Sequence, residues 1–482
     1  MEPFIIITIL FAGAFISLLL KQRSIIEFIA AVASLISLGA AISIAFKVAS
    51  AGTYTPSPLF SIDALGAIVL LIVSFVGFLS SLYSIAYLRA ETKQNIIGFH
   101  RVRQYFVLCN LFLATMFTAT MSANPVLTWI FVEATTLSTA FLISFYNKPS
   151  STEAAWKYLI INSVGLLLGF FGTLLYLTSV QSLPEHSLIT WSLLTTNAQH
   201  LNPLVAQIAF IFILIGYGTK MGLAPMHTWL PDAHGKAPAP ISALLSGVLL
   251  NVAFLVIVRF KNITDTIVGK EYTQNLFIVF ALSSILIAAF VILTQRNYKR
   301  LLAYSSIENM GVMALGFGLG GLGIFAAILH MIYHSLIKSS LFFAAGNILL
   351  RYRSTKIREV TGMLSNIPST AIVFMAGFLA VVGLPPFGLF FTKIYILSAG
   401  MQHHLVVTGA TILLLAILFI GFLRHVTSMI FGEKQPELAK EKESVWLVIP
   451  PATLIIVALL LSLYMPPLLN SLIHSAVAQY SL

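Results

Sequence analysis

Four side chains that can carry charge stand inside long apolar runs of this sequence. They are Glu133, Lys220, Lys338 and Lys393. If such runs cross a membrane, each charge at the bilayer centre costs roughly 2.5–3.5 kcal/mol on insertion scales. Ionisable residues in that setting mark ion or proton pathways by default. The four residues therefore predict transport of protons or other ions through a membrane.

One of these runs places two histidines in register with a lysine. The segment "HMIYHSLIKSSLFFAAGN" has His330, His334 and Lys338 at i, i+4 and i+8. At 3.6 residues per turn they share one helix face over about 12 Å. Histidine titrates near neutrality and passes protons through either ring nitrogen, so the row indicates a proton relay. Histidines four residues apart also bind zinc. Because no acid or cysteine stands beside them, we expect no metal and no cofactor.

Glycine and proline interrupt two apolar runs, each close to a lysine. The interruptions are "KMGLAP" at 220–225 and "VVGLPPFGLFFTK" at 381–393. A broken membrane span frees carbonyl groups and exposes helix ends around a cavity. Paired broken spans in the two halves of a chain are typical of transporters built from inverted repeats.

Glu133 is the expected partner of Lys220. Small and hydroxyl side chains dominate positions 134–139, which favours close packing or a water-lined face. A carboxylate favours the charged form of a buried lysine, so the pair would make Lys220 a switchable proton carrier. Two plainer interpretations stay open: Glu133 is a structural acid that binds a neighbouring hydroxyl, or Lys220 extends to the membrane interface.

Five further polar residues are assigned a secondary role on the proton route. His227, Asp232 and His234 follow the first interruption, where they feed the buried lysine or shape a loop. Asn251 lies in the middle of a span and is expected to hold a hydrogen bond or a water molecule. Glu308 lies near one end of its span, either on a proton route or as an acid at a helix start.

The composition places these residues in a membrane protein. Of the 482 residues, 58% are hydrophobic and 9% are charged, whereas soluble proteins carry about 25% charged residues. The net charge of +11 lies in short loops, so it indicates membrane topology and we expect no nucleic-acid partner. Cys109 is the single cysteine, which excludes a disulfide framework.

Runs of roughly 20 apolar residues, the length that spans a bilayer, predict an all-α polytopic membrane protein with about fourteen transmembrane helices. The predicted spans are 3–20, 25–47, 63–88, 103–122, 125–146, 157–180, 203–225, 238–260, 275–294, 301–320, 322–350, 368–398, 404–431 and 445–468. The interruptions lie five spans apart, an odd number, so spans 4–8 (103–260) and 9–13 (275–431) are predicted to be two inverted repeats. Both would lie in a single membrane domain over 1–482.

The basic residues give the predicted orientation. When loops are assigned to alternate sides, one side holds twenty of the 27 Lys and Arg residues and the other holds four. The remaining three are the lysines inside spans. By the positive-inside rule, the richer side is cytoplasmic and both termini lie outside. No cleavable signal is evident, so we expect a multi-pass protein of the cell membrane.

At this point the motifs are recognisable. "KMGLAPMHTWLPDAHGKAPAPISALLSGVLLN", "YKRLLAYSSIENMGVMALG", the histidine row and "VVGLPPFGLFFTK" resemble the proton-conducting antiporter-like subunits of respiratory complex I and its relatives. The first stretch looks closest to component F of hydrogenase 4, a membrane subunit of group 4 NiFe hydrogenases. The resemblance covers nearly the whole chain.

The resemblance implies roles for the residues already singled out. It implies that Glu133 and Lys220 form the pair of a first half-channel, that the histidine row makes a bridge on a broken eleventh span, and that Lys393 is the exit lysine on a broken twelfth. Family members of complex I usually have Lys or His where this chain has Asn251. The connection between the half-channels would then rest on water or on the eleventh span.

We therefore predict a proton-translocating membrane subunit of an energy-converting oxidoreductase complex. The chain has no nucleotide-binding loop, haem motif or cysteine cluster, so the redox chemistry would belong to partners. The expected partners are other membrane subunits, peripheral redox subunits, the lipid bilayer and protons, with sodium as a second possible ion. The alternatives are a subunit of an Mrp-type sodium/proton antiporter, a bicarbonate-uptake module and a passive scaffold, although a scaffold does not explain the buried titratable groups.

Overall fold

The computed structural model describes residues 1–180, 189–433, 438 and 442–481. Its helices, in chain order, are α1 (Glu2–Leu19), α2 (Arg23–Ala51), α3 (Ala64–Lys93), α4 (Phe99–Met121), α5 (Pro125–Ile143), α6 (Pro149–Leu177), α7 (Trp191–Thr196), α8 (Pro203–Met221), α9 (Trp229–Lys236), α10 (Ala239–Leu244), α11 (Leu250–Val268), α12 (Lys270–Leu293), α13 (Tyr298–Leu319), α14 (Leu322–Tyr352), α15 (Met363–Asn366), α16 (Pro368–Val382), α17 (Gly388–His403), α18 (Leu405–Phe431), α19 (Val445–Leu463) and α20 (Pro467–Ser481). A two-stranded hairpin, β1 (Tyr54–Ser57) and β2 (Phe60–Ile62), joins α2 to α3.

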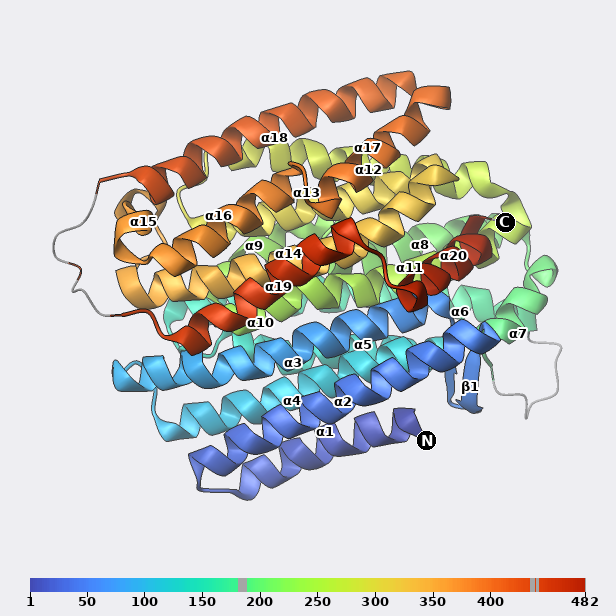
Figure 1. Cartoon of the computed structure of the whole chain (residues 1–482). Helices are drawn as coiled ribbons and strands as arrows, with labels where there is room; N and C mark the ends of the chain where they lie inside the picture. The colour runs from blue at the N-terminus through green and yellow to red at the C-terminus, as the bar shows by residue number, and fades with distance from the viewer. Residues whose placement is uncertain (181–188, 434–437, 439–441, 482) are drawn as a thin grey trace.

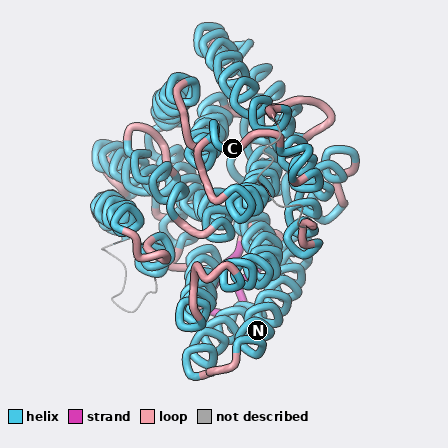
Figure 2. The backbone as a smooth tube through the Cα atoms, turned by 90° about the vertical axis from the view of Figure 1, so that its left-hand side faces the viewer, coloured by secondary structure: helices cyan, strands magenta, loops and turns pink. Residues whose placement is uncertain are grey.

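The long helices lie side by side with their axes roughly aligned (Figure 1), and a view turned by 90° shows most of them nearly end-on (Figure 2). Both chain termini lie at one end of this bundle, which we call the terminal end. The turns between α1 and α2, α3 and α4, and α5 and α6 lie at the opposite end, which we call the basic end because the predicted basic loops lie there. Lys434 and Lys440, counted among those loops, lie outside the described residues.

Twelve helical segments of the described residues are long and apolar enough to cross a membrane. This confirms an all-α, multi-pass membrane protein. The count of about fourteen stays a prediction, because α13 carries several charged residues and because α16 and α17, at 15 and 16 residues, are each short. The structure also adds α20, which the sequence did not predict as an element.

The centre of the bundle is formed by α14 and by the continuous segment from α10 to α11. The most apolar windows of these two segments are 89% and 100% buried, whereas those of α1, α18 and α19 are mostly exposed. α14 packs against α3, α10, α13, α16, α17 and α19. A residue on α14 therefore lies as far from lipid as this chain allows.

Two helices break where the sequence predicted. α8 ends at Gly222, with a φ of +82°, and α16 ends at Gly383, with a φ of +85°. A β-carbon is disfavoured in this left-handed conformation, so glycine suits both ends. A β-carbon at Gly222 would also lie 2.4 Å from Leu230 Cδ1.

The break implied for the eleventh span is wrong. α14 is one uninterrupted α-helix of 31 residues, because no glycine or proline interrupts its apolar core. The irregular turn lies instead in the facing helix, where residues 245–249 form a π-turn between α10 and α11. Such a turn leaves local carbonyl groups with altered partners and is frequent at functional sites.

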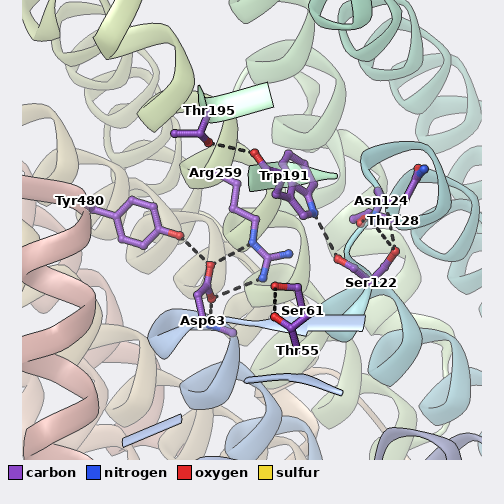
Figure 3. Close-up of polar contacts among 11 residues, drawn as sticks. Thr55, Ser61, Asp63, Ser122, Asn124, Thr128, Trp191, Thr195, Arg259 and Tyr480 are labelled. Atoms are coloured by element: carbon purple, nitrogen blue, oxygen red, sulfur yellow. Dashed lines mark hydrogen bonds and ion pairs between the residues drawn. The ribbon is translucent and has the colours of Figure 1, made fainter. Parts of the chain in front are cut away.

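A buried ion pair ties several elements together at the terminal end (Figure 3). Asp63 caps α3 by accepting from the Gly66 amide at 2.6 Å, and its other oxygen lies 3.3 Å from Arg259 Nε of α11. Tyr480 of α20 donates to the same oxygen at 3.1 Å, and the Arg259 guanidinium lies over the Trp191 ring of α7 at 5.4 Å. The sequence had placed Arg259 at the end of a span, but α11 continues to Val268.

Candidate functional site

Lys220 lies at the end of α8, directly before the break, and is fully buried. Its ammonium group donates to Thr136 Oγ1 at 2.9 Å and to the Tyr158 hydroxyl at 2.8 Å. These partners belong to α5 and α6, so the side chain points into the bundle and does not extend to an interface.

Glu133 is joined to Lys220 through a hydroxyl group. Thr136 Oγ1 donates to Glu133 Oε2 at 3.3 Å, and Ser163 donates to Oε1 at 2.6 Å. The expected direct ion pair is thus replaced by an ammonium–hydroxyl–carboxylate chain. A hydroxyl both accepts and donates, so this chain can pass a proton between the two groups without their meeting.

Lys393 lies on α17, after the second break, and is paired with Glu308 of α13. Its ammonium nitrogen is 3.0 Å from Glu308 Oε1 and donates to the Val381 carbonyl at 3.1 Å. That carbonyl is in the last turn of α16, where the break leaves it without a helical partner. Glu308 is the eleventh of the 22 residues of α13, near its middle and not near its end as the sequence suggested.

His330 connects to this second ion pair from two sides. Its Nδ1 is 2.9 Å from Thr392 Oγ1, and its Nε2 is 3.0 Å from Asn309 Oδ1. The Asn309 amide donates to the Glu308 carboxylate, so its oxygen faces the histidine. An amide oxygen can only accept, so Nε2 carries the hydrogen in this arrangement.

His334 and Lys338 continue the row along α14 and are both fully buried. Lys338 donates to the Leu302 carbonyl of α13 and lies 5.7 Å from the Phe342 ring centre. Neither ring nitrogen of His334 contacts a hydrogen-bond partner among the described residues. Buried polar atoms of this kind are usually satisfied by an ordered water, which would extend the row toward Lys338.

Asn251 crosses from α11 to α14 beside His334. Its Nδ2 donates to Ser335 Oγ at 2.7 Å and to the Gly247 carbonyl of the π-turn at 2.9 Å. The two helices approach so closely that a β-carbon at Gly247 would lie 2.2 Å from Ser339 Oγ. The predicted hydrogen-bonding residue is therefore placed at the contact between the two halves of the chain.

The three residues after the first break lie in different surroundings. Asp232 joins a partly exposed ion network with Arg300 and Lys157 at 2.5 and 3.5 Å. His227 is largely buried, with its ring 6.3 Å from that of Tyr304. His234 is fully buried with its ring 5.1 Å from that of Phe342, the residue that Lys338 also approaches. Of the three, His234 lies beside the buried row, and Asp232 holds the surface.

Sequence reasoning missed the neutral residues that complete both clusters. Tyr158 and Ser163 come from α6, and Thr392 comes from α17, and their sequence surroundings do not separate them from other polar residues of spans. Thr136 could have been found, since it stands three residues after Glu133 and therefore on the same helix face. We call the two clusters and the residues between them the polar axis: Glu133, Thr136, Lys220, Asn251, His334, Lys338, His330, Asn309, Glu308 and Lys393.

The fold and the two lysine clusters define a class of protein that comparisons with known families identify. Residues 122–420 match the family described as "NADH:quinone oxidoreductase/Mrp antiporter, TM". Residues 49–96 match the N-terminal family "NADH-Ubiquinone oxidoreductase (complex I), chain 5". The chain belongs to this family of antiporter-like membrane subunits.

Individual relatives are more specific. The "Hydrogenase-4 component F homolog" of Methylacidiphilum infernorum is 40% identical over 351 residues, which are 72% of this chain and 74% of the relative. A chain of the archaeal membrane-bound sulfane sulfur reductase has the same fold with a TM-score of 0.87 at 23% identity, covering 99% of this chain and 97% of its own. A chain of the Mrp complex from Dietzia sp. DQ12-45-1b gives 0.86 at 19% identity, covering 100% and 97%.

Proposed function

We propose that this chain is the proton-translocating subunit of an energy-converting oxidoreductase complex of the hydrogenase-4 or complex I kind. One observation carries the proposal: two buried lysines at two broken helices each reach a carboxylate, Lys220 through a hydroxyl and Lys393 directly. Titratable and amide groups lie between them on α11 and α14. The 40% identity to a hydrogenase-4 component F homolog supports the same conclusion.

The proposed mechanism begins at Lys220. A change of charge in a neighbouring subunit acts on Glu133, which is partly exposed at the surface of this chain. Proton transfer through Thr136 then changes the charge of Lys220, and the next proton moves by water and Asn251 to the row on α14. The Glu308–Lys393 pair opens as the proton arrives, and Lys393 releases it. Each step exchanges one proton between adjacent groups.

The two lysine clusters also support a repeat architecture. We propose that 103–260 and 275–431 are inverted repeats within one membrane domain, because each contains one broken helix that ends at a left-handed glycine beside its lysine. We further propose that the basic end faces the cytoplasm and that both termini lie outside, in a cell or inner membrane. The concentration of lysine and arginine in the loops of that end supports this orientation.

The partners follow from the absence of redox motifs in the sequence. We propose that peripheral redox subunits and other membrane subunits supply the energy, and that the chain itself holds no cofactor. The structural relatives are chains of multi-subunit membrane assemblies, which supports this proposal.

An Mrp-type sodium/proton antiporter is the second candidate, because its complex has the same fold with a TM-score of 0.86. The ion carried decides between the two. In proteoliposomes that contain the native complex, redox turnover should acidify one side, and the sodium ionophore monensin combined with sodium-free buffer should not abolish this. A dependence on sodium would favour the antiporter.

The Lys393→Ala variant tests the chemistry of the second cluster. Redox-driven proton transport should fall by roughly 100-fold, since the variant leaves Glu308 as an unpaired buried charge. Lys21→Ala, at an exposed loop position, is the matched control and should transport normally. Normal transport by Lys393→Ala would contradict the proposal.

A further inference from the structure

A cavity of about 460 Å³ opens at the basic end, away from the polar axis. It lies where the last turns of α3 and α14 meet the first turns of α16 and α19. Four cationic side chains line it: Lys93, Arg351, Arg353 and Lys442. Glu443 is the single carboxylate among the lining residues.

That carboxylate is already occupied. Glu443 accepts from the backbone amides of Ser369 and Thr370 at 2.8 and 2.9 Å, and so caps the start of α16. Lys93, Arg353 and Lys442 are exposed and pair with no acid among the described residues. The cavity therefore holds an excess of positive charge that the described part of the chain does not neutralise, which favours an anionic ligand.

Two neutral features of the cavity suit an anion with bonded oxygens. Ser444 lines the cavity and precedes α19, whose first turn receives no side-chain cap. The uncapped amides of a helix start carry partial positive charge and bind phosphate oxygens. Arginine adds a planar group that pairs with phosphate through two hydrogen bonds.

An apolar stripe continues from the cavity along the outer face of α19. Trp446, Ile449, Ile456 and Leu460 lie on it at helical spacing and are 66%, 46%, 55% and 57% exposed. Tryptophan concentrates at membrane interfaces, where one end of the side chain is apolar and the other is wet. The stripe thus begins at interfacial depth, beside the cationic cavity, and runs toward the terminal end.

We propose that this cavity binds the phosphate headgroup of an anionic phospholipid, with the acyl chains along the α19 stripe. Basic pockets between transmembrane helices bind such headgroups. A free phosphate ion would satisfy the cations, but it would make no use of the adjoining apolar stripe. Bound in this way, the lipid fastens the peripheral helix α19 to α3 and to α14, which carries the histidine row.

The experiment compares the lipids retained by the purified native complex. The wild type is placed in nanodiscs of phosphatidylcholine containing a small fraction of phosphatidylglycerol, and bound lipids are counted by native mass spectrometry. The test variant is Lys93→Gln with Arg353→Gln, and the control is Lys21→Gln with Arg424→Gln, two exposed cations outside the cavity. None of these residues belongs to the polar axis.

The wild type and the control should retain phosphatidylglycerol, and the test variant should bind it more weakly by roughly fivefold for each cation removed, about 30-fold in all. Equal retention by the test variant would overturn the proposal. So would equal losses in the test and control variants, which would indicate general surface charge. Displacement of the lipid by inorganic phosphate at the same concentration would also overturn it, and would assign the cavity to a free anion.

Discussion

At the scale of single residues, the two buried lysines are held in different ways. Lys220 contacts two hydroxyl groups, whereas Lys393 lies 3.0 Å from a carboxylate. A full charge stabilises an ammonium ion more strongly than a hydroxyl dipole does. This difference suits a path in which the first lysine passes its proton on and the second holds a proton until its carboxylate is displaced.

Thr136 is the residue whose loss should separate these functions most cleanly. Thr136→Val keeps the shape of the side chain but removes the hydroxyl between Lys220 and Glu133. Proton transport should fall by roughly tenfold, corresponding to about 1.4 kcal/mol in the barrier. Proteoliposome acidification measures it, and Thr136→Ser, which restores the hydroxyl, should recover most of the rate. Equal rates for the Val and Ser variants would remove Thr136 from the path.

At the scale of elements, the breaks in α8 and α16 bring the lysines to helix ends. The sequence predicted both breaks, because glycine and proline mark them locally. It also predicted the alignment of His330, His334 and Lys338, which depends only on helical spacing. It did not predict that Glu308 pairs with Lys393, nor that Asn309 and Thr392 hold His330, because these contacts join α13, α14 and α17 and arise from tertiary packing.

The break in α8 can be tested through Gly222. In Gly222→Ala the new β-carbon would adopt a left-handed conformation and lie 2.4 Å from Leu230 Cδ1. The cost should be about 1–2 kcal/mol for the backbone alone, seen as a lower apparent melting temperature in detergent. Gly39→Ala is the control, because a β-carbon there has open space within α2 and should be neutral or slightly stabilising. A melting temperature unchanged in Gly222→Ala would show that the break does not need glycine.

At the scale of the whole molecule, the terminal end is fastened by Asp63 and Arg259. The pair joins α3 to α11, and Tyr480 brings in α20, near the end of the chain (Figure 3). These contacts span most of the sequence, so no local pattern could predict them. The class of fold, in contrast, follows from composition and apolar run length, which are properties of the whole chain.

This pair should give the bundle an acid-sensitive stability. Burial raises the pKa of Asp63, but the Arg259 charge and the Gly66 amide together outweigh it and hold the pKa below its ordinary value. A depressed carboxyl pKa contributes stability above the unfolded pKa of about 4, and this is lost as pH falls through the folded pKa. The melting temperature should therefore depend on Asp63 at pH 5–7 and lose that dependence in stronger acid.

The comparison of wild type with Asp63→Asn measures this contribution. The variant should melt lower than the wild type at neutral pH, and the gap should close as the pH falls below about 4. A gap of constant size across the whole range would show that Asp63 acts through its shape and not through its charge.

The central claim is that protons cross this chain through Lys220 and the polar axis. The most direct measurement is the number of protons moved per electron by the reconstituted complex with Lys220→Ala, compared with Lys157→Ala, whose exposed amine faces Glu153 on the same helix as Tyr158. The account predicts a lower ratio for Lys220→Ala, with electron transfer continuing or slowing, and an unchanged ratio for Lys157→Ala. An undiminished proton ratio in Lys220→Ala would contradict it.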